Sequence, residues 1–358
     1  MSLMTTNLKL NTINIANKKI GPGYPCMIIA EAGVNHNGRL DMACQLIDVA
    51  VEAGADAVKF QTFRAERLLI SGAPKADYQI KATSRNESQY EMLESLELSP
   101  EIHQELMSYC LHKDILFMSS PFDKESADLL KKLNVAAYKI PSGEITNLSL
   151  LNHVARKGLP MIISTGMASL TEVKEAVKVV KACGNEEILL LHCVSNYPTN
   201  PVDANLLAIK TMTQELSVPV GYSDHTMGSE VSLAAVALGA CVIEKHFTLD
   251  RSQHGPDHHI SLEPDELAGL VRSIRVVESA LGHGRKEPAL VEEEVAAVAR
   301  RSLVAAKEIS AGSAVTEDMI SFRRPGTGLP PSMCNNLIGK IVRQDVKIGT
   351  LFTLEMFK

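Results

Sequence analysis

Eight short apolar runs recur between residues 27 and 246, and segments with helical periodicity separate them. Between the first two runs, for example, apolar residues fall at helical spacing at Leu40, Ala43, Leu46 and Ile47. Strand-helix alternation repeated eight times predicts a (β/α)8 TIM barrel. An open doubly wound sheet is the alternative, but no GxGxxG motif follows the first run. The runs span residues 27–31, 57–61, 115–120, 136–141, 160–165, 187–192, 218–223 and 241–246.

The chain is predicted to divide after the barrel. A helix is expected over residues 264–281, and the stretch 282–288 is rich in helix breakers and charge. We therefore expect a barrel domain at 1–283, a linker at 284–300 with an acidic helical part, and a small β-rich domain at 301–358. The small domain has eight Lys/Arg and five Asp/Glu, so its charge is +3, against −9 for the rest of a chain with net charge −6. Residues 63–100 form a long gap between the second and third runs, and this gap predicts an insertion over the barrel mouth.

Composition and charge exclude several classes of protein. The net charge of −6 and the absence of a long basic cluster argue against a nucleic-acid binder. The longest apolar stretch, residues 233–243, is too short to span a membrane, and no signal core precedes residue 25. The seven cysteines are scattered and form no CxxC pair. We expect a reduced, cytoplasmic globular protein.

Polar side chains cluster where the predicted strands end. In a TIM barrel the carboxyl ends of all strands meet at one mouth, where the chemistry is built. A single Ser or Thr there is most simply a cap, but residues from all eight ends converge while the strand interiors stay apolar. The collection predicts an active site. It comprises Glu31, Lys59, Gln61, Ser119, Ser120, Lys139, Ser142, Glu144, Ser164, Thr165, His192, Ser195, Tyr197, Ser223, Asp224, His225, Glu244 and His246.

Two parts of this collection suggest specific ligands. Lys139 together with strand-end serines could hold a phosphoryl group without a glycine-rich loop; a structural pair between Lys139 and Glu144 is the open alternative. His225 and His246 end successive runs, and two imidazoles with open positions suit Mn²⁺, Zn²⁺ or Fe²⁺ acting on a carbonyl. Glu244 could be a third ligand or support one.

Several motifs, in order, resemble the sialic acid synthase family over essentially the whole chain. Its tail resembles the antifreeze-like (SAF) domain that this family appends to its barrel. Many motifs in the right order are far more specific than any single one. They are residues 29–38 (IAEAGVNHNG), 58–62 (VKFQT), 138–144 (YKIPSGE), 164–167 (STGM), 191–193 (LHC), 197–199 (YPT), 221–226 (GYSDHT), 244–248 (EKHFT), 255–258 (GPDH) and 323–328 (RRPGTG).

The resemblance implies a metal-dependent condensation of phosphoenolpyruvate with an N-acylated amino sugar, chiefly N-acetylmannosamine, to give N-acetylneuraminic acid and phosphate. Mn²⁺ is the implied metal, with Mg²⁺ or Co²⁺ as alternatives, on His225 and His246. Glu31 and Glu144 would be catalytic, and Glu144 the base. The implied phosphoenolpyruvate ligands are Lys59, Ser120, Lys139, Ser142, Ser164, Ser195 and Ser223, and the implied sugar ligands are Gln61, Tyr197, Asp257 and Arg324.

Arg324 matches a family arginine that reaches the barrel of a partner subunit, so the resemblance also implies a domain-swapped homodimer. Legionaminic or pseudaminic acid synthases, which use 2,4-diacetamido-2,4,6-trideoxyhexoses, belong to the same family and remain alternatives. Ser195 stands where some members have Asn. A related synthase acting on an aldose phosphate would need a second cationic cluster, which the sequence lacks. A non-catalytic carbohydrate-binding or ice-binding protein would need neither the histidines nor Lys139.

Overall fold

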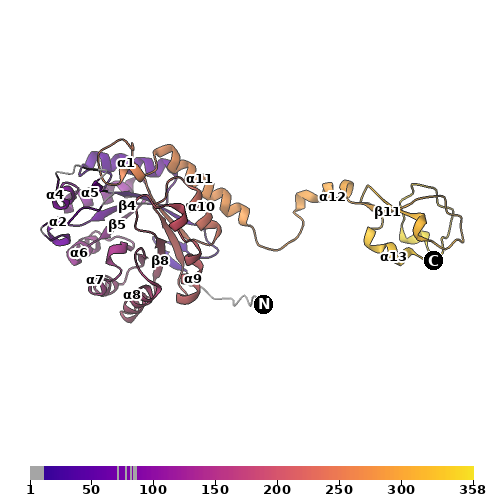
Figure 1. Ribbon diagram of the computed structural model, residues 1–358, viewed down its shortest axis with the longest axis horizontal. Helices are drawn as coiled ribbons and strands as arrows, with labels where there is room; N and C mark the ends of the chain where they lie inside the picture. Colours follow the sequence, from indigo (N-terminus) through magenta and orange to yellow (C-terminus); the bar gives the residue numbers. More distant parts are fainter. Residues whose placement is uncertain (1–11, 71, 77–78, 81–82, 84–86) are drawn as a thin grey trace. The chain divides into compact units, whose positions relative to one another are not determined.

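The computed structural model describes residues 12–70, 72–76, 79–80, 83 and 87–358 (Figure 1). The chain divides into two compact units, residues 1–282 and 283–358. Each unit is described by itself below.

The first unit contains one eight-stranded sheet in the order β5-β4-β3-β10-β9-β8-β7-β6. Every strand pairing in this sheet is parallel. The sheet is a nearly closed barrel, and the TIM-barrel prediction is confirmed. All eight predicted runs became strands: β3 Met27–Gly33, β4 Ala57–Thr62, β5 Leu116–Pro121, β6 Tyr138–Ile140, β7 Met161–Ser164, β8 Ile188–Cys193, β9 Val220–Asp224 and β10 Val242–His246.

Helices follow the strands and cover the outside of the barrel (Figure 1). Helix α8 shows why these segments are helical: Ser169 and Glu172 form a capping box, and Val173, Ala176 and Val180 bury one face. The last barrel helix has the bounds predicted from the sequence. The helices are α1 Leu40–Ala53, α5 Pro100–His112, α6 Lys124–Lys132, α7 Leu148–Ala155, α8 Leu170–Ala182, α9 Leu207–Leu216, α10 Glu230–Ala237 and α11 Pro264–Leu281, with short 3-10 turns η1 Ser142–Glu144, η2 Pro201–Asp203 and η3 His258–Ile260.

A short hairpin covers the amino-terminal end of the barrel. It pairs β1 Ile13–Ile15 with β2 Lys18–Ile20. Its three isoleucines, Ile13, Ile15 and Ile20, are buried against strand-start residues such as Met27 and Val242. Because apolar side chains fill the barrel interior at this end, the polar side chains of the interior gather at the opposite end.

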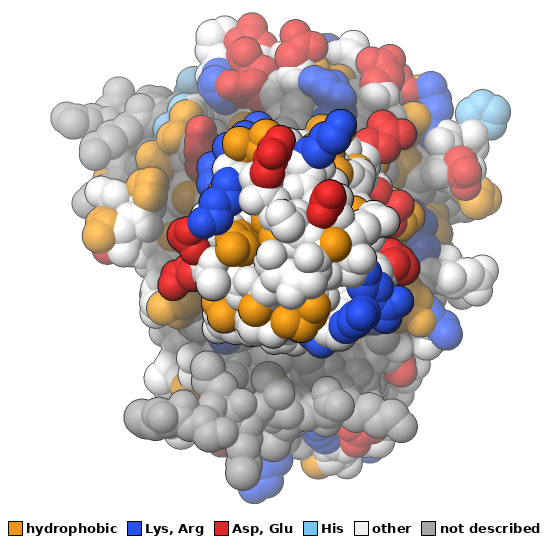
Figure 2. All heavy atoms as spheres, turned by 90° about the vertical axis from the view of Figure 1, so that its right-hand side faces the viewer, with side chains coloured by type: hydrophobic (Ala, Val, Ile, Leu, Met, Phe, Trp, Pro, Cys, Tyr) orange, Lys and Arg blue, Asp and Glu red, His pale blue; other side chains and the backbone are white. Residues whose placement is uncertain are grey.

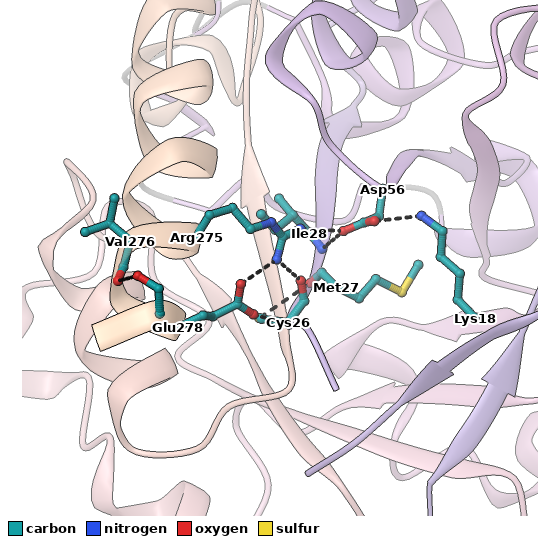
Figure 3. A network of polar contacts seen from close by, with 9 residues as sticks. Lys18, Cys26, Met27, Ile28, Asp56, Arg275, Val276 and Glu278 are labelled. Atoms are coloured by element: carbon teal, nitrogen blue, oxygen red, sulfur yellow. Dashed lines mark hydrogen bonds and ion pairs between the residues drawn. The ribbon is translucent and has the colours of Figure 1, made fainter. Parts of the chain in front are cut away.

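A polar network holds this end of the barrel to α11 (Figure 3). The Asp56 carboxylate accepts hydrogen bonds from the backbone N–H of Ile28 at 2.9 Å and from Arg275 at 3.2 Å, and pairs with Lys18 at 2.7 Å. Arg275 also donates to the Cys26 carbonyl and to Glu278, whose carboxylate accepts the Cys26 N–H. The first residues of β3 are thus tied to the hairpin and to α11.

The insertion predicted at residues 63–100 contains α2 Ala65–Leu68 and α4 Gln89–Ser95 in its described part. It has its own small core, in which Val34, Phe63, Met92 and Leu96 are buried. The insertion is therefore a packed element beside the carboxyl ends of β4 and β5.

The second unit consists of turns around a compact core. It begins with η4 Leu290–Glu292 and α12 Glu293–Ala299, where the acidic helical connector was expected. Strands β11 Ser302–Ala305 and β12 Ile320–Arg323 pair antiparallel. The other short elements of this unit are η5 Glu317–Met319, η6 Pro331–Met333, α13 Cys334–Leu337 and η7 Leu354–Met356. Its core includes Leu303, Val315, Val342, Phe352 and Phe357. Its surface mixes groups of basic side chains with acidic and apolar ones (Figure 2).

Within the described residues, no helix is both long enough and apolar enough to cross a membrane.

Candidate active site

A cavity of about 450 Å³ opens at the carboxyl ends of the barrel strands. Of the fifteen residues for which the family resemblance implies a role, thirteen line it, Glu144 does not, and Arg324 belongs to the second unit. The thirteen are Glu31, Lys59, Gln61, Ser120, Lys139, Ser142, Ser164, Ser195, Tyr197, Ser223, His225, His246 and Asp257, and Glu244 joins them.

Two lysines and two glutamates form a buried charge cluster in this cavity. Lys59 and Lys139 are each only 3% exposed. The Lys59 ammonium lies 2.7 Å from Glu31 and 3.8 Å from Glu244, and the Lys139 ammonium lies 3.4 Å from the other oxygen of Glu244. The alternating geometry of the strands explains the convergence, since all four residues face the barrel interior near the strand ends.

The four charges perturb one another. Burial raises the pKa of Glu31 to about 7, although Lys59 opposes this shift. Burial alone would also raise the pKa of Glu244, but Lys139 and Lys59 together hold it below its ordinary value. The carboxylates raise the pKa of Lys59 against burial, whereas burial dominates at Lys139 and lowers its pKa. Glu31 can therefore change protonation near neutral pH.

Hydroxyl groups surround the cluster. Ser120 accepts a hydrogen bond from Lys59 at 3.0 Å, and Ser223 donates to Glu244 at 3.0 Å. The Ser164 hydroxyl is buried and has no hydrogen-bond partner among the described residues, so it is available to a ligand.

Ser142 and Ser195 meet around Gly166. The Gly166 N–H donates to Ser142 at 3.0 Å, and Ser142 contacts the Cys193 sulfur at 3.0 Å. A Cβ at Gly166 would lie 2.3 Å from the Ser195 hydroxyl. Only glycine lets the β7 loop approach these two serines.

His225 and His246 face each other across the mouth, with ring centroids 5.6 Å apart. The Nδ1 of His225 lies 2.7 Å from the Val194 carbonyl, so this nitrogen carries the proton and Nε2 is left as a lone-pair donor. The Nδ1 of His246 is buried, and no residue in the described part of the chain forms a hydrogen bond with it. Burial is the main cause that lowers both pKa values, that of His225 to about 4. Both imidazoles are therefore neutral and able to bind a cation.

The fit to a metal rests on these two nitrogens. The described residues contain no group of three or more His, Cys, Asp or Glu arranged to hold a metal ion. Asp257 is near, with a carboxylate oxygen 4.0 Å from the His246 Nδ1. Two neutral imidazoles with an unpartnered nitrogen suit an open site that is completed by water and substrate.

A network behind the two histidines fixes their positions. Asp224, which is 1% exposed, accepts hydrogen bonds from the Thr226 N–H, the Thr226 hydroxyl, Ser232 and Lys245. Asp224 precedes His225 and Lys245 precedes His246, so the network joins the two strands immediately beside the imidazoles. This pairing could not be predicted from the sequence, because Asp224 and Lys245 become neighbours only through strand pairing.

Three of the four predicted sugar ligands, Gln61, Tyr197 and Asp257, line the cavity. Tyr197 packs on His225 with ring centroids 4.2 Å apart. Burial raises the pKa of Asp257 to about 6. Gln61 lies on β4 and lines the same cavity. Arg324 is exposed and belongs to the second unit.

Glu144 lies beside the cavity. Its neighbours Ser142 and Gly143 line it, but the Glu144 carboxylate accepts a hydrogen bond from the Asn147 side chain at 2.7 Å. The alternative pair between Lys139 and Glu144 is not formed, since Lys139 faces Glu244 instead.

Sequence reasoning missed one wall of the cavity. Phe63, Leu68, Leu69 and Leu93 from the insertion line it together with Phe122, and so do Gln79 and Gln89. The available signal was the presence of large apolar residues in an otherwise polar insertion, but their shared face depends on how the insertion folds.

A TIM barrel with acid, base and cation-binding groups gathered at the carboxyl ends of its strands is an enzyme fold with its active site in the usual place. Comparison with known proteins gives the family. The model described as the NeuB family matches residues 46–286, and that of the SAF domain matches residues 300–358.

Relatives match over nearly the full length. The chain is 47% identical to the N,N'-diacetyllegionaminic acid synthase of Legionella pneumophila, with 98% of this chain and 99% of that protein covered. It is 41% identical to the N-acetylneuraminate-9-phosphate synthase of Mus musculus, with 90% of each covered. The crystal structure of the N-acetylneuraminic acid synthetase of Leptospira borgpetersenii superposes with a TM-score of 0.72 at 40% identity, covering 80% of this chain and 95% of that one.

The chain therefore belongs to the NeuB family, and it is an enzyme of the nonulosonic acid synthase type with a SAF domain. The family resemblance in the motifs is confirmed. The role of each site residue stays a prediction.

Proposed function

We propose that this enzyme condenses phosphoenolpyruvate with an open-chain 2,4-diacetamido-2,4,6-trideoxymannose and water, giving N,N'-diacetyllegionaminic acid and phosphate. The observation that carries the condensation is the buried pair of Lys59 and Lys139 at the strand ends. Cations removed from water beside several hydroxyl groups suit a small, highly charged anion. Phosphoenolpyruvate, with its carboxylate and phosphate, is such an anion.

The charge balance of the cluster supports this assignment. With all four groups ionised, Lys59 and Lys139 only offset Glu31 and Glu244, so an arriving anion meets no net positive charge. When Glu31, whose pKa is about 7, takes up a proton, the net charge of the cluster becomes positive, which favours binding of the anion. The same protonation frees Lys59 from its ion pair.

The reaction needs three events at the carbons. C3 of phosphoenolpyruvate attacks the aldehyde carbon of the sugar and forms the new C–C bond, while the π electron pair of the aldehyde moves to its oxygen, which takes up a proton. This step leaves C2 electron-poor. Water then adds to C2 and loses its proton to a base. The C2–O bond to phosphate breaks last, and phosphate leaves with both electrons of that bond. We assign the base to Glu144 and the positioning of the phosphate to Lys139, Ser142 and Ser164.

We propose that His225 and His246 hold a divalent metal, Mn²⁺ in the first instance. Such an ion would polarise the aldehyde when bound. The assignment can be tested without catalysis by Mn²⁺ titration followed by electron paramagnetic resonance. We expect His225→Ala and His246→Ala to weaken Mn²⁺ binding at least tenfold, whereas His192→Ala, which removes a histidine bonded to the Ala204 carbonyl, should not. Equal affinity in all three variants would contradict the metal assignment.

The choice of sugar follows the relatives. Two of them are N,N'-diacetyllegionaminic acid synthases, 47% and 46% identical, against 41% and 40% for the mouse and human N-acetylneuraminate-9-phosphate synthases. The cavity also offers little to a sugar phosphate, because Lys59 and Lys139 are the only cations among the described residues that line it. N-acetylmannosamine, the first expectation from sequence, remains the competing substrate.

The decisive experiment is phosphate release from phosphoenolpyruvate in the presence of Mn²⁺ with each sugar in turn. We expect kcat/KM to be at least tenfold higher for the diacetamido sugar than for N-acetylmannosamine. The reverse order would make the enzyme an N-acetylneuraminate synthase. No release with either sugar would contradict the condensation itself.

We further propose a domain-swapped homodimer in which Arg324 of one subunit serves the barrel of the other. The support is that Arg324 is exposed in a unit separate from the barrel, while the family resemblance places it at the sugar. We also propose that the enzyme works in the cytoplasm, where its seven free cysteines would stay reduced.

A further inference from the structure

The cavity has two chemically different sides. Tyr197, which follows β8, His225 after β9 and His246 on β10 form a polar side. Across the barrel, β4 and β5 are adjacent strands, and the chain beyond them supplies large apolar side chains. We call this second side the apolar wall and define it by Phe63, Leu68, Leu69, Leu93 and Phe122.

The apolar wall is a built surface. Phe63 is 4% exposed, and its ring meets that of Phe122 edge to face with centroids 5.9 Å apart. Leu68 and Leu93 pack against the small core of the insertion. The wall is thus held from behind, while the faces of its side chains line the cavity.

The position of the wall indicates which part of a substrate would reach it. Phe63 lies two residues beyond Gln61, and Phe122 lies two residues beyond Ser120. The wall therefore begins further out along the strands than Lys59 and Ser120, which face the charge cluster. A sugar whose aldehyde reacts above that cluster would turn its distal carbons towards the wall.

The two candidate sugars differ at those distal carbons. N-acetylmannosamine has hydroxyl groups at C4 and C6, whereas the diacetamido sugar has an acetamido group at C4 and a methyl group at C6. Hydroxyls pressed against leucine and phenylalanine lose their water without gaining partners, but methyl groups gain from burial. Gln79 and Gln89, which also line this side, can hydrogen-bond the C4 amide.

We propose that the apolar wall is the element that selects the 6-deoxy, 4-acetamido sugar. This inference rests on the proposed function and names its specificity determinant. It predicts that a polar substitution in the wall changes the choice between sugars and leaves phosphoenolpyruvate binding intact.

The test compares Leu69→Asn with Ile70→Asn. Both positions follow α2, but Leu69 lines the cavity whereas Ile70 is 80% exposed and does not. The measurement is kcat/KM for each sugar, together with the KM for phosphoenolpyruvate. For Leu69→Asn we expect the ratio of the two kcat/KM values to fall at least tenfold, since a few methyl groups in an apolar pocket give discrimination of that order. Ile70→Asn should keep the wild-type ratio.

Leu93→Asn provides a second variant from a different helix, with Glu94→Asn as its exposed control. If the wild type prefers the diacetamido sugar but Leu69→Asn and Leu93→Asn both keep that preference, the wall does not select the sugar and the proposed function stands. If the wild type prefers N-acetylmannosamine, both the sugar assignment and the role of the wall are overturned.

Discussion

Glu31 lies on β3 and Glu144 lies in η1 after β6, and their carboxylates have different surroundings. Glu31 is 2% exposed and bound to Lys59, whereas Glu144 is half-buried and bound to Asn147. The environment of a carboxylate decides whether it works as an acid, a base or a counter-ion. The two residues should therefore respond differently to the same substitution.

We expect Glu144→Gln to lower kcat by a factor of about 10² to 10⁴, the range for loss of a general base, with little change in the KM for phosphoenolpyruvate. Glu31→Gln should instead change that KM, because it removes the counter-charge of Lys59. Steady-state kinetics with phosphoenolpyruvate as the varied substrate separates the two effects. A kcat within threefold of wild type for Glu144→Gln would transfer the base role to Glu31.

His36 offers a prediction about stability. It is fully buried, its Nδ1 accepts a hydrogen bond from the Gly38 N–H at 3.0 Å, and burial lowers its pKa to about 3. Since the folded state holds His36 neutral and the unfolded state protonates it near pH 6.5, the stabilisation is complete above pH 6.5 and is lost as the pH falls towards 3. The loss should be about 1.4 kcal/mol per pH unit below pH 6.5.

Calorimetric melting of the metal-free protein between pH 7.5 and 5 checks this expectation. His36→Gln keeps an acceptor for Gly38 and should melt with a weaker pH dependence than wild type. His112→Gln, which changes an exposed histidine on α5, is the control. Identical pH slopes in wild type and His36→Gln would refute the assignment.

At the scale of elements, the Asp56 network holds β3 to the hairpin and α11. Asp56→Ala would leave the buried Ile28 N–H without its acceptor, at a cost of about 1–3 kcal/mol. Lys18→Ala removes only an exposed ion pair and should cost less than about 1 kcal/mol. Hydrogen exchange of the peptide that contains Ile28 measures the effect locally. Equal protection from hydrogen exchange in the two variants would mean that Asp56 contributes no more to stability than its ion pair with Lys18 does.

The order of the barrel strands and the bounds of α11 could be predicted from the sequence, because each depends on local signals. Strand β9 is a short apolar run that ends at Asp224, and α11 starts with a proline and ends before Gly282. The eight strand ends also located most of the cavity lining in advance, since the barrel brings all carboxyl ends together.

What the sequence could not predict were contacts between elements. The sequence suggested Glu144 as the protein partner of Lys139, but the structure places Lys139 beside Glu244 from a strand far away along the chain. The apolar wall likewise depends on how α2 and α4 pack on Phe63. Such pairings are set by register and packing, which a single sequence leaves open.

At the scale of the whole molecule, the proposed domain swap makes the active site a shared property of two chains. A mixture of Arg324→Ala and Glu144→Gln chains would then contain some sites with both native residues. If the chains pair at random, about a quarter of all sites keep both native residues, so we expect the mixture to show about a quarter of wild-type activity. Each variant alone should stay nearly inactive. Measurement of phosphate release after co-refolding or co-expression tests this, and recovery no greater than the sum of the two variants would argue for self-contained chains.

The hairpin of β1 and β2 has a kinetic consequence. Its isoleucines close the amino-terminal end of the barrel. Both substrates of the proposed reaction therefore enter through the opening at the carboxyl ends of the strands. With phosphoenolpyruvate at the lysines and the sugar nearer the rim, a bound sugar would obstruct the way to the lysines. The enzyme should therefore bind its substrates in a compulsory order, with phosphoenolpyruvate first. Excess sugar should act as a competitive inhibitor with respect to phosphoenolpyruvate.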